Sequence, residues 1–269
     1  MSLSVILFLF LTHLGIGIVW TLLLVSHAAG VKFFRFNAGL AVALLVIGLA
    51  FRPEPLVLGG VASGVALGAL VVTLGTLVVY WVTIGRALAA LRPGLLWLAS
   101  AGGLATLMAQ ALALGSSLTV APTALAVASF LTSAALMGSS CTAMILGHWY
   151  LILPSLDIAL LQGMVKFHIG STIARTLVVL AAVWIAIVWW EPGLGPSFQR
   201  YVLSSAGVFF WQRVLFGLLG PAVLAYLTWE TAKIRSTQSA TGILYVDFFT
   251  VIVGEVLAKY LYLSTSVPV

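Results

Sequence analysis

The sequence predicts an all-α membrane protein, a polytopic bundle of about eight transmembrane helices. Hydrophobic residues make up 62% of the 269 residues, charged residues make up 7%, and the mean hydropathy is +1.21. A soluble domain is about 25% charged, so this chain lacks the charged surface that a soluble enzyme or a nucleic-acid-binding module needs. Its apolar runs approach or exceed about 20 residues, the length of a spanning helix, whereas the strands of a membrane barrel alternate over about ten.

Clusters of charged and turn-forming residues divide the chain into the predicted spans. These spans cover about residues 4–28, 36–51, 56–84, 95–115, 122–152, 168–190, 201–228 and 239–262. The third and fifth are long enough to cross with a tilt, while the second is the shortest and leaves seven spans if it lies at the interface. The expectation is a single integral membrane domain over residues 1–269, in a multi-pass protein of the cell membrane.

The charges of the connections predict the orientation of the bundle. With eight spans, one side receives seven basic residues: Lys32, Arg35, Arg86, Arg92, Lys166, Lys233 and Arg235. The other side receives three: Arg52, Arg200 and Lys259. Because cytoplasmic connections carry the excess of Lys and Arg, the first side is predicted to be cytoplasmic, and both termini are predicted to lie on the non-cytoplasmic side. The formal charge of +6 therefore reports orientation and indicates no nucleic-acid partner.

Two rows of small residues at every fourth position predict close contacts between helices. The rows are Gly60, Gly64 and Gly68 in the third span, and Ser139, Ala143 and Gly147 in the fifth. Small side chains let two helix backbones approach, and van der Waals contact then drives their association in lipid. We expect both rows to be packing faces.

The first predicted span carries two histidines, His13 and His27, which lie 14 residues apart. Fourteen helical residues return to nearly the same face about 21 Å further along, which is the geometry that two stacked haems would need. The spacing resembles that of the paired histidines of the cytochrome b family, over one helix only. That family carries a second such pair, whereas His148 and His168 are 20 residues apart, so a two-haem arrangement is not expected.

Three histidines are predicted to lie near the cytoplasmic face, because His27 ends the first span, His148 ends the fifth and His168 begins the sixth. One b-type haem there would take His27 and either His148 or His168 as axial ligands. The same three imidazoles also suit a zinc or copper ion. The plainer alternative is that they are interfacial side chains bonded to carbonyls or lipid phosphates. His13 lies deeper, and it could ligate haem, contact a quinone or bridge helices.

Five charged residues fall inside apolar runs: Arg175, Arg213, Asp247, Glu255 and Lys259. Ionisable groups are costly there and usually functional. Glu255 and Lys259 are four residues apart on one helix and can pair, which lowers the cost of burial. These groups could carry protons for quinone chemistry, while Arg175 or Arg213 could hold haem propionates. A charge-paired contact between helices explains the same residues equally well.

The last predicted span carries a Gly254-Glu255 pair, followed by the basic Lys259 and by Tyr260 and Tyr262. In these features it resembles the final helix of the membrane-anchor subunits of DMSO reductase-type complexes, which also have eight spans with both termini outside. The resemblance covers about one helix. It implies a quinone-reactive anchor that docks an iron–sulfur subunit and a molybdenum catalytic subunit. Anchors of this family often lack haem, whereas this chain has four histidines in or near its spans.

These features together predict an integral membrane subunit of a respiratory-type electron-transfer complex. It would pass electrons between the quinone pool and a redox partner, an iron–sulfur or cytochrome c protein, through b-type haem. The subunit itself would be non-catalytic or quinone-reactive, and no catalytic residue is assigned. The alternatives are an ion or small-solute transporter that uses the intramembrane charges, a membrane enzyme with a histidine-bound metal, and an anchor subunit without a cofactor. The enzyme is disfavoured because the sequence lacks an HExxH-like spacing.

Overall fold

The computed structural model describes residues 3–53, 60–86, 89–115, 120–189 and 197–269. Over these residues the chain is helical and has no strand, and eight segments are long and apolar enough to cross a membrane. The prediction of an all-α polytopic bundle is therefore confirmed. The α-helices are α1 (Leu3–Leu22), α2 (Gly30–Ala50), α3 (Val61–Thr83), α4 (Arg92–Leu114), α5 (Val120–Ile152), α6 (Ala159–Val188), α7 (Phe198–Val202), α8 (Val208–Val214), α9 (Gly220–Lys233) and α10 (Thr237–Thr265).

The seventh span is composite. It begins with the 3₁₀ turn η3 (Ser205–Gly207) and continues through α8, the π-helical segment η4 (Leu215–Leu219) and α9. Two further 3₁₀ turns, η1 (His27–Ala29) and η2 (Ala89–Leu91), precede α2 and α4. π-helical turns inside α-helices are rare and often mark functional sites. The position of η4 is therefore a first structural pointer to a site.

Several span boundaries differ from the prediction, and two of the differences change the position of a histidine. The sixth span begins at Ala159 rather than at 168, because the Asp157 carboxylate accepts a hydrogen bond from the Ala159 N–H (3.0 Å) and so starts the helix early. His168 consequently lies nine residues into α6, about 13 Å from its start. His27 lies in η1, between α1 and α2 rather than at the end of a longer first span.

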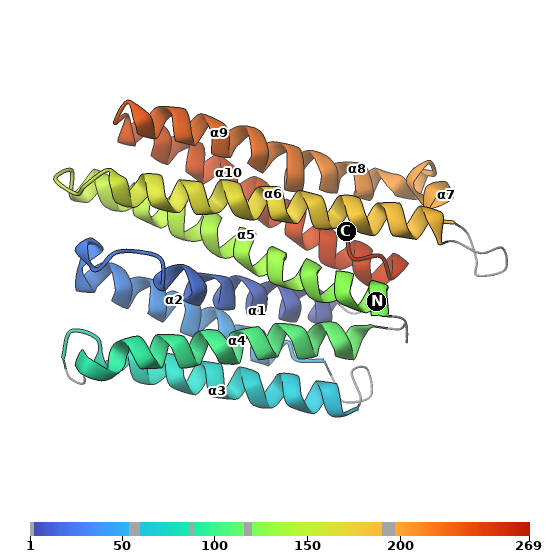
Figure 1. Cartoon of the computed structure of the whole chain (residues 1–269), viewed down its shortest axis with the longest axis horizontal. Coiled ribbons are helices and arrows are strands. Elements are labelled where there is room, and N and C mark those ends of the chain that lie inside the picture. Colours follow the sequence, from blue (N-terminus) through green and yellow to red (C-terminus); the bar gives the residue numbers. More distant parts are fainter. Residues whose placement is uncertain (1–2, 54–59, 87–88, 116–119, 190–196) are drawn as a thin grey trace.

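α1 occupies the centre of the bundle, where it contacts α2, α4 and α5. In Figure 1 the first four spans, blue to green, lie below α5, α6 and the C-terminal helices, which are coloured from green to red. Gly15 of α1 faces Leu45 of α2, and Gly17 faces Gly138 of α5. A Cβ added to Gly17 would lie 2.0 Å from the backbone oxygen of Ala134, so α1 and α5 touch backbone to backbone.

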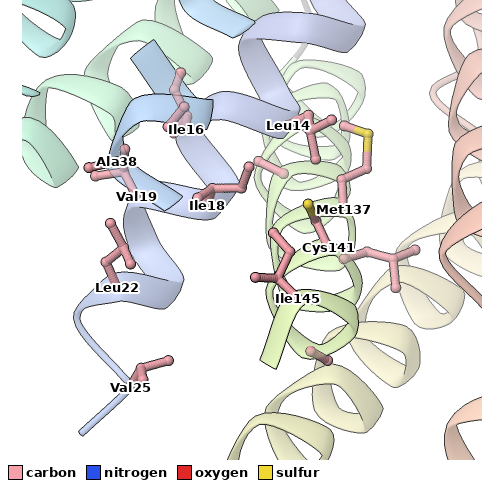
Figure 2. Packing of buried hydrophobic residues seen from close by; sticks show 14 of the residues in the cluster. Leu14, Ile16, Ile18, Val19, Leu22, Val25, Ala38, Met137, Cys141 and Ile145 are labelled. Atoms are coloured by element: carbon pink, nitrogen blue, oxygen red, sulfur yellow. The ribbon is translucent and has the colours of Figure 1, made fainter. Parts of the chain in front are cut away.

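Apolar side chains fill the rest of the contact between α1 and α5. Figure 2 shows Leu14 and Ile18 of α1 pointing toward Met137, Cys141 and Ile145 of α5. All five side chains are buried and belong to one continuous apolar cluster. Because lipid tails are as apolar as leucine, this contact stabilises the bundle mainly through van der Waals packing.

The two predicted rows of small residues have different outcomes. Gly147 of α5 faces α10, where an added Cβ would lie 3.0 Å from Thr241 Oγ1 and 3.2 Å from Leu244 Cδ1, so this glycine lies in a packing face as predicted. Cβ atoms added to Gly64 and Gly68 of α3 would meet no described atom within 4 Å. The packing role predicted for the row in α3 is therefore wrong within this chain, because α3 contacts α4 through another of its faces.

Candidate functional site

Glu255 of α10 lies at the centre of a buried cluster of three cationic side chains. Its Oε1 accepts hydrogen bonds from Arg175 Nε of α6 (3.0 Å) and from Arg213 Nη2 of α8 (2.9 Å). Its Oε2 lies 3.4 Å from Lys259 Nζ, one turn further along α10. All four side chains are between 0% and 5% exposed. The predicted pair of Glu255 and Lys259 is confirmed, and two arginines from other helices join it.

Serine hydroxyls of α5 connect this cluster to α1. Ser133 Oγ donates to Glu255 Oε2 (2.6 Å) and accepts from Lys259 Nζ (2.9 Å). The same hydroxyl lies 3.2 Å from His13 Nδ1. Because the Ser133 hydrogen points to Glu255, His13 Nδ1 must be the donor in this contact, and in the neutral form of the ring Nε2 is then the accepting nitrogen. His13, Ser133 and Glu255 form a hydrogen-bonded series from α1 through α5 to α10.

Two glycines make room for Arg213 to reach Glu255. Gly217 of η4 lies against Gly254 of α10, where an added Cβ on Gly254 would come within 2.1 Å of Gly217 Cα. A Cβ added to Gly217 itself would lie 1.8 Å from Arg213 Nη1. Any side chain at Gly217 would therefore occupy the space of the guanidinium. The π-helical turn thus brings α8 and α10 together at the level of Glu255.

Asp247 of α10 forms a second polar contact, two turns before Glu255. Its Oδ2 accepts a hydrogen bond from Ser140 Oγ of α5 (2.6 Å) and lies 3.0 Å from His168 Nε2 of α6. The other ring nitrogen, His168 Nδ1, lies 3.0 Å from Ser139 Oγ. All these side chains are buried. Both carboxylates of α10 are therefore contacted from the same two helices, α5 and α6.

The spacing along the three helices explains why the contacts form two layers. In α5 and α6 the contributing residues are seven apart, Ser133 and Ser140 in α5, and His168 and Arg175 in α6. The two carboxylates of α10 are eight apart. Seven or eight residues are two helical turns, about 11 Å, so each helix presents a polar group at the same two heights. We call these the Glu255 layer (Ser133, Arg175, Arg213, Glu255, Lys259) and the Asp247 layer (Ser139, Ser140, His168, Asp247).

Some polar atoms of the two layers, and of His13 beside them, lack a hydrogen-bond partner within the part of the chain that the structure describes. They include His13 Nε2, Arg213 Nε, Arg213 Nη1 and Asp247 Oδ1. The Glu255 layer also has three cations around one carboxylate. A buried polar atom without a partner is costly, so these atoms are places where water, a proton or a ligand would be stabilised.

Two spaces near His13 differ greatly in size. The smaller is about 10 Å³, is lined by His13, Arg175 and Lys259 among others, and has room for about one water molecule. The larger is about 260 Å³, lies between α1, α3 and α4, and is mainly apolar, with the buried Gln110 in its wall. Gln110 Nε2 lies 3.4 Å from Thr12 Oγ1, and its side chain is also a neighbour of the His13 ring. Gln110 therefore lies between the larger space, which we call the α1–α3–α4 pocket, and the polar series.

The three histidines predicted to share one face do not come together. His168 is fully buried and has both nitrogens against the Asp247 layer. His148 is exposed, and its Nδ1 lies 3.2 Å from the Tyr245 hydroxyl. The His27 ring lies 5.6 Å from that of Phe34. Among the described residues, no three His, Cys, Asp or Glu side chains are grouped so that they could hold a metal ion.

A haem with two axial histidines does not fit the described side chains. His13 has an unpartnered nitrogen, but the space beside it is about 10 Å³. His27 lines a larger space, about 500 Å³, whose other described lining residues include no second histidine. Arg175, predicted as a partner for a propionate, instead bonds Glu255 and donates from Nη1 to Ser129 Oγ (2.6 Å). The b-type haem therefore stays a prediction from the sequence.

The sequence analysis missed the serines, Gln110 and Gly217. Ser133 and Ser140 carry a signal, since their seven-residue spacing places both hydroxyls on one side of α5. Gln110 and Gly217 matter only because α1 and α10 pack against them, which no local pattern encodes. Comparisons with protein-family models and with curated proteins find no match to this chain.

Proposed function

We propose that this chain is the membrane subunit of a quinone-linked electron-transfer complex in the cell membrane, and that its two polar layers handle the protons of the quinone. The single observation that carries the proposal is the series His13–Ser133–Glu255, which begins beside Gln110 at the wall of an apolar pocket and ends among three cations. Oxidation of a quinol releases two electrons and two protons, so such a site needs both an apolar ring pocket and a proton acceptor.

The α1–α3–α4 pocket suits the ring of a quinone. Phe8, Leu9 and Leu67 give it apolar walls, and Gln110 adds an amide that can donate to a quinone carbonyl or accept from a quinol hydroxyl. A pocket that is mostly apolar with few polar groups is the usual form of a small-molecule site. At about 260 Å³ it exceeds the space beside the Glu255 layer by far. This difference favours a quinone site over a transport path through the charges.

The hydrogen-bonded series of His13, Ser133 and Glu255 can accept a proton from a quinol. In its neutral form His13 has an accepting nitrogen, Nε2, without a hydrogen-bond partner among the described residues, and a donating nitrogen that faces Ser133. A proton taken up at Nε2 can leave from Nδ1 to the Ser133 hydroxyl, which passes its own proton to Glu255. Glu255 holds this proton only in transit, because the three cations around it favour its charged form. Arg175 and Lys259 compensate the carboxylate and hold it in place. The two electrons would pass to a partner subunit, an iron–sulfur or cytochrome c protein.

The likeness of α10 to the DMSO reductase-type anchors supports the same proposal, because its Gly254-Glu255 pair and Lys259 lie in the Glu255 layer. No step of the proposal passes through haem. A reduced-minus-oxidised spectrum of the purified protein tests the haem prediction directly, and a b-type band would add the haem to the electron path.

Two leucine substitutions on α3 test the pocket. Gly64 lines it and Gly75 does not, and a Cβ added at either would meet no described atom within 4 Å. In lipid nanodiscs, we expect saturable binding of a short-chain benzoquinone or naphthoquinone to the wild type. Gly64→Leu should weaken binding on the order of tenfold, since overfilling a site costs about 1–3 kcal/mol, and Gly75→Leu should not. Absence of binding to the wild type, or equal loss in both variants, would contradict the quinone site.

A serine substitution tests the proton series separately. Ser133→Ala removes the hydroxyl between His13 and Glu255 without touching the pocket. Quinone binding should be kept, while quinol oxidation in native membranes should fall by about 10²-fold or more, the usual contribution of a positioned proton-transfer group. Unchanged oxidation would show that the protons take another route.

A further inference from the structure

A second large space lies at the end of the bundle where α1 joins α2 and α3 joins α4. It is about 500 Å³ and is lined mainly by apolar residues. The His27 ring and the charged Arg92 also line it. Trp97, 66% exposed, and Val31, 47% exposed, form part of its wall, so the space opens to the surroundings of the bundle rather than to its centre. We call it the α1–α4 end pocket. None of its lining residues belongs to either polar layer, and it has no part in the proposed function.

Basic residues line this pocket or lie next to its lining residues in the sequence. Lys32 follows Val31 in α2, and Arg86 follows the lining residue Ile84 by two positions. Arg35 of α2 donates from Nη2 to the Ile84 carbonyl oxygen, which ties the end of α3 to the start of α2. Arg92 at the start of α4 donates from Nη2 to the Thr83 carbonyl oxygen (3.3 Å). The two hairpins thus carry four cations, of which Arg92 lines the pocket and the other three lie within two sequence positions of a lining residue.

The part of the chain that forms this pocket, within positions 1–156, is almost without acidic residues. Glu54 is the only acidic residue in positions 1–156, and in the sequence it follows the C-terminal end of α2, whereas the pocket is lined by the N-terminal end of this helix. Within the described residues, none of Lys32, Arg35 and Arg86 takes part in a salt bridge. The acidic residues at the same end of the other half have partners of their own. Glu230 pairs with Lys233 (2.7 Å), and Asp157 accepts from the Ala159 N–H (3.0 Å).

From this charge complementarity we infer that the α1–α4 end pocket binds one anionic phospholipid, with its phosphate at the cationic rim and the start of an acyl chain against Trp97. The pocket has the apolar wall that an acyl chain needs and the cations that a phosphate needs. Basic pockets between spanning helices on the cytoplasmic side commonly bind anionic head groups, and this end is the one predicted to be cytoplasmic. A tryptophan at the membrane interface also suits a chain that enters the bilayer there.

Three glutamine substitutions at exposed cations test the inference. Lys32→Gln and Arg86→Gln remove charge at the rim, whereas Arg235→Gln removes a charge at the same end of the bundle but in the other half. Binding of phosphatidylglycerol and of phosphatidylcholine with identical acyl chains is measured by native mass spectrometry. A matched titration with inorganic phosphate separates a lipid from a free anion.

We expect the wild type to retain one phosphatidylglycerol in preference to phosphatidylcholine. Each rim substitution should weaken phosphatidylglycerol about fivefold and the double substitution about 25-fold, the effect of one or two basic residues at an anionic head group. Arg235→Gln should leave the affinity within about twofold, since it lies outside the pocket. Equal affinity for the two lipids, equal loss in all three variants, or full displacement by inorganic phosphate would overturn the inference. A haem band abolished by His27→Ala would overturn it as well, because the pocket would then hold haem.

Discussion

The Glu255 and Asp247 layers are built on the same three helices but compensate their carboxylates differently. Each carboxylate accepts a hydrogen bond from a serine of α5 at 2.6 Å, and each lies 3.0 Å from a nitrogen of a basic residue of α6. Glu255 also forms salt bridges with Arg213 of α8 and with Lys259 of its own helix. Asp247 has no further cation among the described residues, and its Oδ1 has no hydrogen-bond partner there.

The difference indicates different roles for the two layers. Glu255 connects α5, α6, α8 and α10 through charged hydrogen bonds, so the bundle depends on its charge. The Asp247 layer connects only α5, α6 and α10 and keeps spare acceptor capacity. We therefore expect stability to depend most on the Glu255 layer.

Glu255→Gln should have the largest effect, because it leaves three buried cations without their counter-charge. Removing one partner of a buried ion pair costs about 3–5 kcal/mol, and we expect a loss of that size in the free energy of unfolding in mixed micelles. Glu230→Gln is the matched control, since its pair with Lys233 is over 40% exposed and should contribute about 0–1 kcal/mol. Equal free energies of unfolding for these two variants would contradict the dependence of the bundle on the charge of Glu255.

Gly217→Ala should rank next, through packing rather than charge. The new methyl group would lie 1.8 Å from Arg213 Nη1, so Arg213 would have to leave Glu255 or α8 would have to move away from α10. Overpacking of this kind costs about 1–3 kcal/mol. Gly64→Ala is the control, because its methyl group would meet no described atom within 4 Å. Thermal unfolding in detergent should separate the two, and equal midpoints would contradict the close contact at Arg213.

Asp247→Asn should cost less than Glu255→Gln. The amide keeps one oxygen for Ser140 or His168, and only one neighbouring basic side chain, His168, loses its contact with a carboxylate. We expect the free energy of unfolding to fall by about 1–2 kcal/mol in the same measurement, which is the scale of a single buried hydrogen bond. A loss as large as that of Glu255→Gln would mean that the Asp247 layer is equally important for the fold.

Tyr245→Phe should have the smallest effect. Its hydroxyl lies 3.2 Å from His148 Nδ1, but both side chains are exposed and outside the two layers. A change within about 0.5 kcal/mol is expected, as for other surface substitutions. A larger loss, or loss of a haem band in His148→Ala, would extend the functional region to this part of α5 and α10.

The sequence supported the fold and the choice of charged residues well. The scarcity of charge singled out Arg175, Arg213, Asp247, Glu255 and Lys259, and the structure buries all five. The depth of each histidine in the bundle could not be predicted from the sequence, because it depends on where the helix that carries it begins. Because α6 begins at Ala159, His168 lies within the helix rather than at its start, and it contacts Asp247 there.

The sequence by itself determined the helical fold, because the lipid environment and the length of the apolar runs allow no other structure. Apolar runs of spanning length must form helices in a bilayer, since every backbone group needs an internal hydrogen bond there. The partners of the charges were decided only by tertiary structure. Ser133, Arg213 and Glu255 are 42 to 122 residues apart, and they meet because glycines such as Gly217 and Gly254 let particular helices touch. Contacts of this kind depend on side-chain volume at one point on each of two helices, and no pattern along a single helix records them.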